Sequence, residues 1–191
     1  MTEKALPQFI HHESSPLGDI LLAADEAGLT GLWFEGQKNY ARTLSPESGE
    51  RELPVFRQAK HWLEVYFAGK EPAFSVPLHP MGTAFQQRVW DFLRTIPYGN
   101  TATYGEIAKR LAAENGLAHL SAQAVGGAVG RNPISILIPC HRVIGADGSL
   151  TGYAGGIGRK RALLTLEREG VVNAAEAIPQ AAQQRSRMRQ P

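Results

Sequence analysis

Three prolines within nine residues constrain the fold of this chain more than any other feature of its sequence. The segment PAFSVPLHP carries Pro72, Pro77 and Pro80. Proline lacks a backbone N–H group and restricts the residue before it to extended conformations, so the segment disfavours both a helix and a central strand. We therefore predict a domain boundary here, with one domain over residues 1–80 and a second over 81–170.

The first domain is predicted to be a small antiparallel sheet with one helix. Short apolar pieces at Phe9–Ile10, Ile20–Ala24 and Leu29–Phe34 are separated by turns that contain glycine. The polar stretch 37–52 is predicted to be a loop or linker. The sequence FRQAKHWLEVYF, residues 56–67, places apolar side chains at helical spacing.

The second domain is predicted to be mostly helical. Thr83, Thr103 and Ser121 can each cap a helix, the second of them over Tyr104–Ala112. A further helix is predicted over Arg159–Arg168. Two short helices joined by a loop are typical of a helix-turn-helix unit, although an ordinary helical hairpin fits the spacing equally well.

Charge is distributed unevenly along the chain. Residues 1–80 hold 7 basic and 11 acidic side chains, a net charge of −4, whereas residues 81–191 hold 13 basic and 7 acidic ones, a net charge of +6. A basic half suggests a domain that faces a polyanion. With 191 residues, 43% hydrophobic and 20% charged, the chain lies in the globular range, which excludes collagen, coiled coil and wholesale disorder.

Neither a membrane span nor a secretion signal is apparent. No apolar run approaches the roughly 18 residues that a membrane span needs. The N-terminus MTEKALPQF lacks a basic and then apolar signal segment. We therefore expect a soluble cytoplasmic protein that does not interact with membranes.

The segment SAQAVGGAVG places two adjacent glycines, Gly126 and Gly127, inside a predicted helix. Each glycine costs about 1 kcal/mol of helix stability relative to alanine, so something other than helix propensity must favour them. Close approach of a nucleic acid to the backbone is one explanation, and tight packing of the helix on the core is the other.

Cys140 is the single cysteine of the chain, which excludes an internal disulfide and a multi-cysteine zinc site. The apolar run Ile134–Ile138 is predicted to be a buried strand, so Cys140, His141 and Arg142 would follow a strand end. A thiol becomes a nucleophile as thiolate, for which His141 is the candidate base and Arg142 adds positive potential. From these residues alone, a small buried hydrophobic cysteine is an equal alternative.

Several segments in order resemble the O6-alkylguanine-DNA alkyltransferase family, the methylated-DNA–protein-cysteine methyltransferases. They are FQQRVW, the Tyr104 helix, AVGGAVGRNP, IPCHRV and GYAGG, and the resemblance extends from Thr83 to Gly170 with a looser match before it. It implies an α/β protein of two domains. The first would be a small antiparallel-sheet domain of ribonuclease H-like type, and the second a mostly helical domain with a helix-turn-helix.

The resemblance also implies an activity and the residues that perform it. Cys140 would irreversibly accept the alkyl group of O6-alkylguanine, and by extension O4-alkylthymine, in DNA. His141 would act as base through a water, Glu167 would orient His141, and Asn132 would stabilise the adjacent turn. Tyr104 would supply a proton at guanine N3. No cofactor is implied.

The pocket for the damaged base is likewise implied by the resemblance. A buried pocket requires the nucleotide to flip out of the DNA stack. Val143 and Cys140 would offer backbone carbonyls to the exocyclic amine, and Tyr153 with the backbone N–H of Ala154 would close the pocket. The packing of Val129 and Ser135 would influence its size.

The family inserts the helix at 122–130 into the minor groove of double-stranded DNA, which would explain its small side chains. Most members carry an arginine that fills the space of the flipped base, and this chain has Gln123 there. The loss of that cation predicts weaker DNA binding. The other DNA-facing residues would be Ala122, Ala124, Gly126, Gly127 and Arg131.

Other features of the sequence carry less information. Some family members bind a structural zinc in the first domain, but no cysteine lies there, and the histidines do not make a ligand set, so we expect no metal. The tail 171–191, with Arg185, Arg187 and Arg189, is predicted to be disordered, and it either adds DNA affinity or has no role. We expect a monomer.

Three other functions are compatible with parts of the sequence. A cysteine-lacking, alkyltransferase-like protein would only flag damage, and the presence of Cys140 speaks against it. A helix-turn-helix regulator would need a longer, polar recognition helix. A cysteine hydrolase is disfavoured because adjacent residues rarely bring a thiol and an imidazole face to face.

Overall fold

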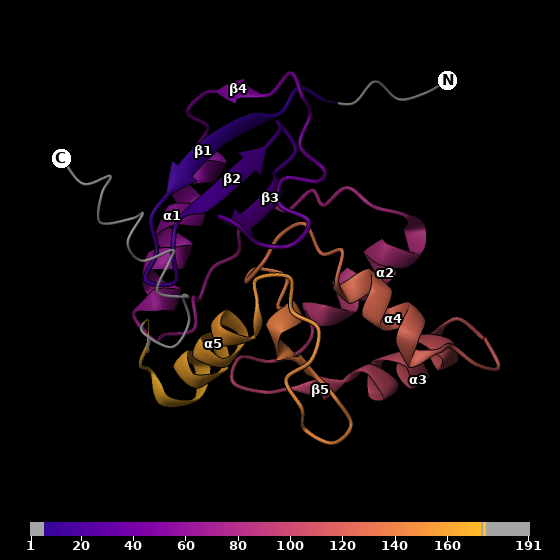
Figure 1. Ribbon diagram of the computed structural model, residues 1–191. Helices are drawn as coiled ribbons and strands as arrows, with labels where there is room; N and C mark the ends of the chain where they lie inside the picture. The colour runs from indigo at the N-terminus through magenta and orange to yellow at the C-terminus, as the bar shows by residue number, and fades with distance from the viewer. Residues whose placement is uncertain (1–5, 173, 175–191) are drawn as a thin grey trace, which may run out of the picture.

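The sheet predicted for the first domain is present. The computed structural model describes residues 6–172 and 174 (Figure 1). Strands β1 (Phe9–Glu13), β2 (Ile20–Ala24) and β3 (Leu29–Phe34) form an antiparallel sheet, and β4 (Gly49–Glu50) pairs parallel with β1. The strand order is β3-β2-β1-β4. The predicted tail 171–191 lies almost wholly outside the described residues.

The segment 37–52, predicted to be only a loop or linker, also has a structural role. It contributes β4 to the sheet edge, and its side chains Ala41 and Leu44 pack on a small cluster on one face of the sheet. That cluster consists of Leu21, Ala23 and Trp33. The segment therefore covers apolar surface that would otherwise face water.

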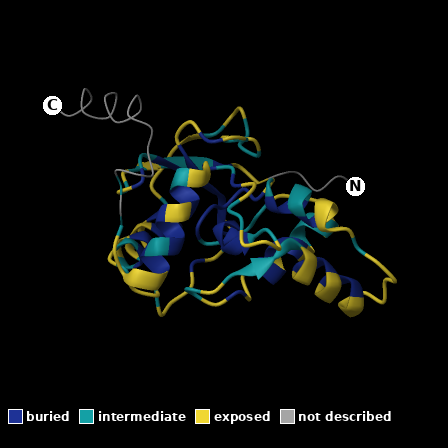
Figure 2. Ribbon diagram, turned by 60° about the horizontal axis from the view of Figure 1, so that its bottom comes forward, coloured by how far each residue is buried: buried dark blue, intermediate teal, exposed yellow. Residues whose placement is uncertain are grey.

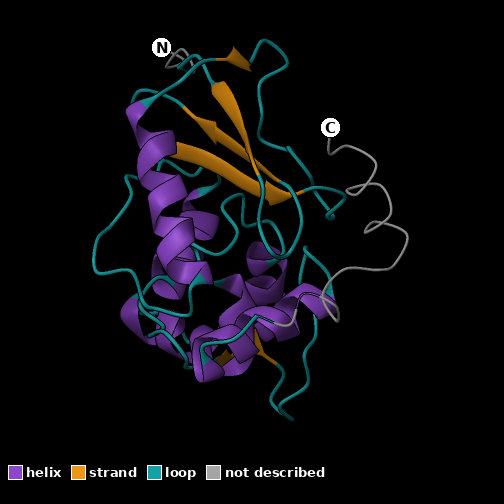
Figure 3. Cartoon of the chain, turned by 90° about the vertical axis from the view of Figure 1, so that its left-hand side faces the viewer, coloured by secondary structure: helices purple, strands orange, loops and turns teal. Residues whose placement is uncertain are grey.

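Helix α1 (Pro54–Phe67) packs against the sheet, as Figure 3 shows. Its buried side chains recur at helical spacing: Val55, Phe56, Ala59, Leu63 and Tyr66. A proline in the first turn, where no intrahelical N–H is needed, fixes the start of the helix. The predicted helix is thus confirmed, two residues longer at its start.

The second half contains four helices among the described residues: α2 (Ala84–Leu93), α3 (Tyr104–Glu114), α4 (Ala122–Val129) and α5 (Ile157–Glu169). Thr83 and Thr103 form capping boxes with Gln86 and Glu106, and the Ser121 side chain accepts a hydrogen bond from Ala124 N. These caps satisfy N–H groups that a helix start leaves free. Figure 2 shows buried helix faces turned inward and exposed faces outward.

Helices α2, α3 and α4 pack on one another, away from the sheet in Figure 1. The Trp90 indole of α2 donates to the Ala128 carbonyl of α4 over 3.0 Å. A pair of two-residue strands, β5 (Ala102–Thr103) and β6 (Val143–Ile144), runs parallel beside α3. The predicted fold, a small sheet domain followed by a mostly helical one, is confirmed.

The prediction of a strand over Ile134–Ile138 is wrong. Only Ile134 makes a strand-like bridge, to Leu32 of β3, and the chain then turns. Ile136 adopts a left-handed φ of 68°, which no regular strand contains. The run is apolar because it crosses the core as a tight turn. It leads into a short 3₁₀-helix, η1 (Cys140–Arg142).

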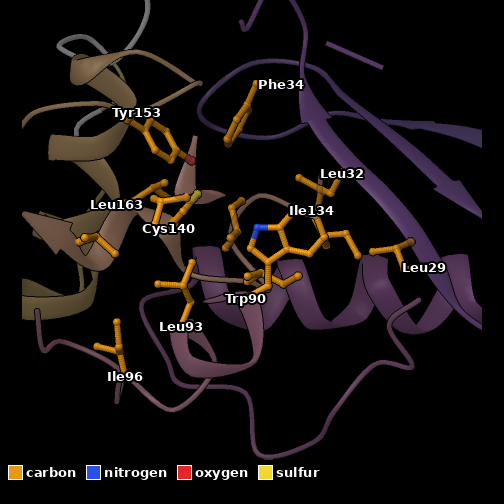
Figure 4. Close-up of a cluster of buried hydrophobic side chains, with 14 of the residues drawn as sticks. Leu29, Leu32, Phe34, Trp90, Leu93, Ile96, Ile134, Cys140, Tyr153 and Leu163 are labelled. Atoms are coloured by element: carbon orange, nitrogen blue, oxygen red, sulfur yellow. The ribbon is translucent and has the colours of Figure 1, made fainter. Parts of the chain in front are cut away.

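One continuous hydrophobic core joins the two halves of the chain. Figure 4 shows Leu29 and Leu32 of β3 in the same cluster as Trp90 and Cys140. Backbone hydrogen bonds reinforce the contact: Leu32 N donates to Pro133 O over 2.9 Å, and Ser135 N donates to Leu32 O over 3.0 Å. The sheet thereby supports the segment that precedes the cysteine.

The ends of α1 and α5 also meet. Gly69 follows α1 with φ 76°, and Gly170 ends α5 with φ 72°. A Cβ atom added to Gly69 would lie 2.4 Å from the carbonyl oxygen of Gly170. Both glycines therefore combine a left-handed helix ending with a backbone contact that excludes any side chain at residue 69.

Candidate active site

The thiol of Cys140 lies in the protein interior, at the first residue of η1. The residue is 4% exposed, and Figure 4 shows it in the same buried cluster as Tyr153 and Leu163. Asn132 Nδ2 lies 3.1 Å from Sγ. The cysteine is thus both a core residue and the acceptor of a hydrogen bond from a polar side chain.

Asn132 organises the turn that delivers the thiol. Its Nδ2 donates to the Ile138 carbonyl over 2.8 Å, and its Oδ1 accepts from Ile134 N over 3.0 Å. A single buried amide therefore fixes both ends of the turn and still reaches Cys140. The role that the family resemblance implies for Asn132 stays a prediction, and these hydrogen bonds place its side chain in the turn next to the thiol.

His141 and Glu167 form a buried pair. His141 Nε2 lies 2.6 Å from Glu167 Oε1, and neither side chain is exposed. Burial lowers the pKa of His141, an effect that the hydrogen bond and charge of Glu167 oppose. A carboxylate only accepts, so Nε2 carries the proton and Nδ1 is the basic nitrogen. Within the described part of the chain, Nδ1 is buried without a hydrogen-bond partner.

Glu167 lies on α5, and its carboxylate accepts hydrogen bonds from four residues. Oε1 accepts from His141, from the Tyr66 hydroxyl at 2.7 Å and from Arg142 Nη2 at 3.0 Å. Oε2 accepts from Arg142 Nε at 2.9 Å and from Gly99 N at 3.1 Å. Burial raises the pKa of Glu167, but the bonds and charges of His141 and then Arg142 outweigh it and hold the pKa far below its usual range.

The sequence suggested that Arg142 adds positive potential near the thiol, but in the structure its side chain pairs with Glu167. Its guanidinium is bonded to both Glu167 oxygens, and its Nη1 donates to the Ile96 carbonyl over 2.6 Å. This bidentate arrangement matches the planar fork of a guanidinium to a carboxylate. Arg142 therefore acts on the carboxylate, and another residue supplies the charge near sulfur.

That residue is Lys160 of α5, which sequence reasoning missed. Its Nζ donates to the carbonyls of Val143 at 2.5 Å and Thr151 at 2.8 Å. Burial lowers the pKa of Lys160 to about 8, and the Cys140 charge opposes this. Burial raises the pKa of the Cys140 thiol, while the Asn132 hydrogen bond and the Lys160 charge lower it.

The residues expected to surround the base lie around this centre. The Tyr104 hydroxyl donates to the Thr151 carbonyl over 3.0 Å. Burial and then the Cys140 charge raise the pKa of Tyr104. Tyr153 is buried, with its ring centroid 6.5 Å from that of His141 in an edge-on arrangement. Burial and then the Cys140 charge raise the pKa of Tyr153 as well, so both phenols are protonated at neutral pH.

The other residues that the resemblance assigns to a base pocket have the following surroundings in the structure. The Val143 carbonyl already accepts from Lys160, which leaves one lone pair for a base. The Ala154 carbonyl accepts from Lys38 N over 3.0 Å, a contact from the loop after β3. Val129 and Ser135 are buried beside the turn that leads to Cys140.

Helix α4 has one buried face and one exposed face. Val125, Ala128 and Val129 are buried, whereas Ala122, Gln123, Ala124 and Arg131 are exposed and Gly126 and Gly127 are half-buried. A Cβ at Gly126 would meet the Tyr104 ring at 3.7 Å, and one at Gly127 would meet Arg131 Nη1 at 3.4 Å. Packing against the core therefore does not require either glycine.

Among residues 6–172 and 174, no three His, Cys, Asp or Glu side chains lie close enough to share a metal ion. In the same part of the chain, no helix is both long and apolar enough to cross a membrane.

The chain matches two family models. Residues 84–169 match the DNA binding domain of 6-O-methylguanine DNA methyltransferase, and residues 10–80 match its ribonuclease-like domain. A methylated-DNA–protein-cysteine methyltransferase of Methanosarcina acetivorans is 50% identical over 153 residues, which cover 80% of this chain and 94% of the relative. The Mycobacterium bovis protein of the same name is 49% identical, covering 83% and 93%.

Solved structures agree with these matches. Mycobacterium tuberculosis OGT in complex with DNA has a TM-score of 0.75 and 45% identity, covering 88% of this chain and 98% of that one. An O6-methylguanine DNA methyltransferase from Methanococcus jannaschii has a TM-score of 0.57 and 27% identity, covering 85% and 96%.

The fold and the buried cysteine centre define an alkyl-accepting, DNA-binding repair protein. The chain belongs to the 6-O-methylguanine DNA methyltransferase family and is a methyltransferase enzyme of DNA repair. The family resemblance of the sequence is thereby confirmed.

Proposed function

We propose that this protein reverses alkylation damage in DNA by moving the alkyl group from O6 of guanine, and from O4 of thymine, to Cys140. The observation that carries the proposal is the hydrogen-bonded thiol of Cys140 directly before the His141–Glu167 pair, with Asn132 Nδ2 at 3.1 Å from the sulfur. A nucleophile, a base and a group that orients the base are thus gathered without a cofactor.

The base step uses the free nitrogen of His141. Buried polar atoms normally have a partner, so Nδ1 is suited to accept the thiol proton through one bridging water. The imidazolium that forms is stabilised by Glu167 at 2.6 Å. Deprotonation makes sulfur a strong nucleophile only at the moment of reaction, because burial otherwise favours the neutral thiol.

The transfer step then balances as an in-line displacement. The thiolate of Cys140 forms a C–S bond to the alkyl carbon while the C–O6 bond breaks, and its electron pair enters the purine. Tyr104 protonates guanine N3, a role supported by its protonated phenol at neutral pH. The proton that His141 took from the thiol then returns to the Tyr104 phenolate through solvent, so the net change is transfer of the thiol proton to the guanine. The hydrogen bond from Tyr104 to the Thr151 carbonyl keeps the hydroxyl at the pocket in the absence of DNA.

Because the thiol is buried, the damaged base must leave the DNA duplex to reach it. The damaged nucleotide flips into a pocket formed by the carbonyls of Cys140 and Val143 and by Tyr153 and Ala154, with Val129 and Ser135 behind them. Helix α4 approaches the minor groove with its exposed residues Ala122, Gln123 and Ala124 and with the half-buried Gly126 and Gly127, and Arg131 follows the end of the helix. Gln123 occupies the gap left by the flipped base.

The product explains the stoichiometry. A thioether is not displaced by any group of this site, so each molecule acts once. The protein acts as a cytoplasmic monomer on double-stranded DNA that contains alkylated bases. Residues 1–80 form the supporting domain and residues 81–170 the reactive domain.

Intact mass spectrometry after incubation with a duplex that contains O6-methylguanine tests the proposal. The expected result is a mass gain of one methylene that is absent in Cys140→Ser. Tight binding of the lesion without any mass gain would favour a protein that only flags damage and would overturn the transfer step. Undamaged duplex of the same sequence is the control.

A further inference from the structure

Helix α1, in the domain that carries no thiol, contributes a side chain to the reactive centre. Tyr66 is fully buried, and its hydroxyl donates to Glu167 Oε1 over 2.7 Å. The same hydroxyl lies 3.4 Å from His141 Nε2. We infer that Tyr66 is a positioning residue for the reaction, which holds the Glu167 carboxylate and keeps the proton of the pair on His141 Nε2. The inference rests on the proposed function of that pair.

The ring of Tyr66 is fixed, so its hydroxyl has a defined direction. Trp62 stacks on it with ring centroids 5.2 Å apart, Phe67 packs edge-on at 5.5 Å, and Tyr98 packs edge-on at 6.0 Å. Burial and then the charge of Glu167 raise the pKa of Tyr66 well above its usual value. The phenol therefore remains a hydrogen-bond donor at neutral pH.

The chemical consequence follows from sharing one oxygen. Oε1 of Glu167 accepts from Tyr66 and from His141, so each donor reduces the electron density available to the other. A donor to a carboxylate stabilises its ionised form and lowers its affinity for a proton. Tyr66 thus weakens the attraction of Glu167 for the imidazolium and keeps His141 neutral, with Nδ1 free to accept.

Other charged, titratable and hydrogen-bonding groups surround the His141–Glu167 pair. Arg142 and the Gly99 N–H also bond to Glu167, Lys160 lies on α5, and Tyr98, Tyr153 and Cys140 line the remaining sides. Of these, Arg142 and the Gly99 N–H hold Oε2, and Arg142 also reaches Oε1. Tyr66 is the uncharged side chain that competes with His141 for the same oxygen.

The decisive experiment compares Tyr66→Phe with Tyr98→Phe in the full-length protein. Tyr98 is a suitable control because its hydroxyl is buried near Glu167 but has no hydrogen-bond partner among the described residues. The readouts are the ¹⁵N resonances of His141 during a pH titration and the single-turnover rate of methyl transfer at each pH.

We expect Tyr66→Phe to raise the pKa of His141 by about one unit, and Tyr98→Phe to leave it unchanged. The acidic limb of the rate profile should move by the same amount, so the rate falls about tenfold below that limb. At higher pH, where the imidazole is neutral in both proteins, the rates should converge. An equal loss at every pH with unchanged His141 resonances would show a purely structural role and overturn the inference.

A second replacement keeps the test decisive if Tyr66→Phe does not fold. Ring-fluorinated tyrosine at residue 66 keeps the shape of the side chain but donates more strongly. It should move the His141 pKa in the opposite direction, downward, and absence of such a shift would also overturn the inference.

Failure of the proposed function is distinguishable from failure of this inference. Wild-type protein that gains no methylene from the damaged duplex contradicts the proposed function, whatever the variants do. The His141 resonances are measured without DNA, so they still decide whether Tyr66 controls the protonation of the pair.

Discussion

The amide of Asn132 donates to the Cys140 sulfur over 3.1 Å and to the Ile138 carbonyl over 2.8 Å. One side chain therefore closes the turn before the thiol and stabilises negative charge on it. Since the thiol is buried, this donor has a large influence on how readily sulfur ionises.

Replacement of that donor by an acceptor of equal size should suppress the nucleophile. In Asn132→Asp, the second carboxyl oxygen cannot donate, so we expect the thiol pKa to rise and its reaction with iodoacetamide near pH 8 to slow at least about tenfold. Asn100→Asp is the control, because Asn100 is exposed and its side-chain amide donates to the Tyr98 carbonyl, away from the thiol. Equal reactivity of both variants would contradict this role.

The buried lysine should make stability depend on alkaline pH. Burial lowers the pKa of Lys160 from 10.5 to about 8 in the folded protein, and the unfolded chain regains the ordinary value. Between these two pH values the unfolded state binds more protons, so this lysine makes the free energy of unfolding increase with pH. Below about pH 8 the lysine is charged in both states, and its contribution is constant.

Denaturant titrations of wild type and Lys160→Met between pH 7 and pH 10 check this expectation. The difference in unfolding free energy, wild type minus variant, should increase above about pH 8. Lys70→Met, which removes the same charge from an exposed position, serves as the matched control. A difference that falls as pH rises would show that the folded protein holds the lysine proton more tightly than the unfolded chain.

Restoring a cation on the exposed face of α4 should strengthen DNA binding. Gln123 is exposed on this helix. We expect Gln123→Arg to raise duplex affinity and to steepen the plot of log affinity against log salt by about one. Gln58→Arg is the control, because it adds the same charge at an exposed position of α1. It should change the duplex affinity and the salt slope less than Gln123→Arg does. Fluorescence anisotropy over a salt series measures both, and identical slopes would remove the idea.

The two glycines of α4 should prove functional and not structural. The nearest atoms to an added Cβ lie at 3.7 Å for Gly126 and 3.4 Å for Gly127, so alanine fits. Gly126→Ala and Gly127→Ala should each raise the free energy of unfolding by about 1 kcal/mol. Duplex binding should weaken if DNA approaches this backbone, and unchanged binding would exclude that approach.

Local sequence signals predicted most of the fold. The caps at Thr83, Thr103 and Ser121 identify three helix starts because capping depends on residues only three positions apart. The three long strands were also recognisable from turns and apolar pieces. The Cys140–His141 pair could be predicted as the site because the two residues are adjacent and lie in a segment that resembles a known family.

The errors have physical causes. A run of five apolar residues, Ile134–Ile138, satisfies a strand pattern, but nothing in it reveals the left-handed Ile136. Tyr66 bonds to Glu167 across 101 residues of sequence, and a tyrosine on the apolar face of a helix is indistinguishable from an ordinary core residue. Arg142 was assigned to the wrong partner because sequence order does not give side-chain direction.

The contact between Gly69 and Gly170 ties a remote position to the chemistry. A Cβ at Gly69 would lie 2.4 Å from the carbonyl oxygen of Gly170. Any side chain at residue 69 would therefore push the ends of α1 and α5 apart. Gly170 directly follows α5, the helix that carries Glu167 and Lys160. A displacement of Gly170 would therefore shift the end of α5 and with it both charged side chains. A substitution at Gly69 would thus change the reactivity of the Cys140 thiol.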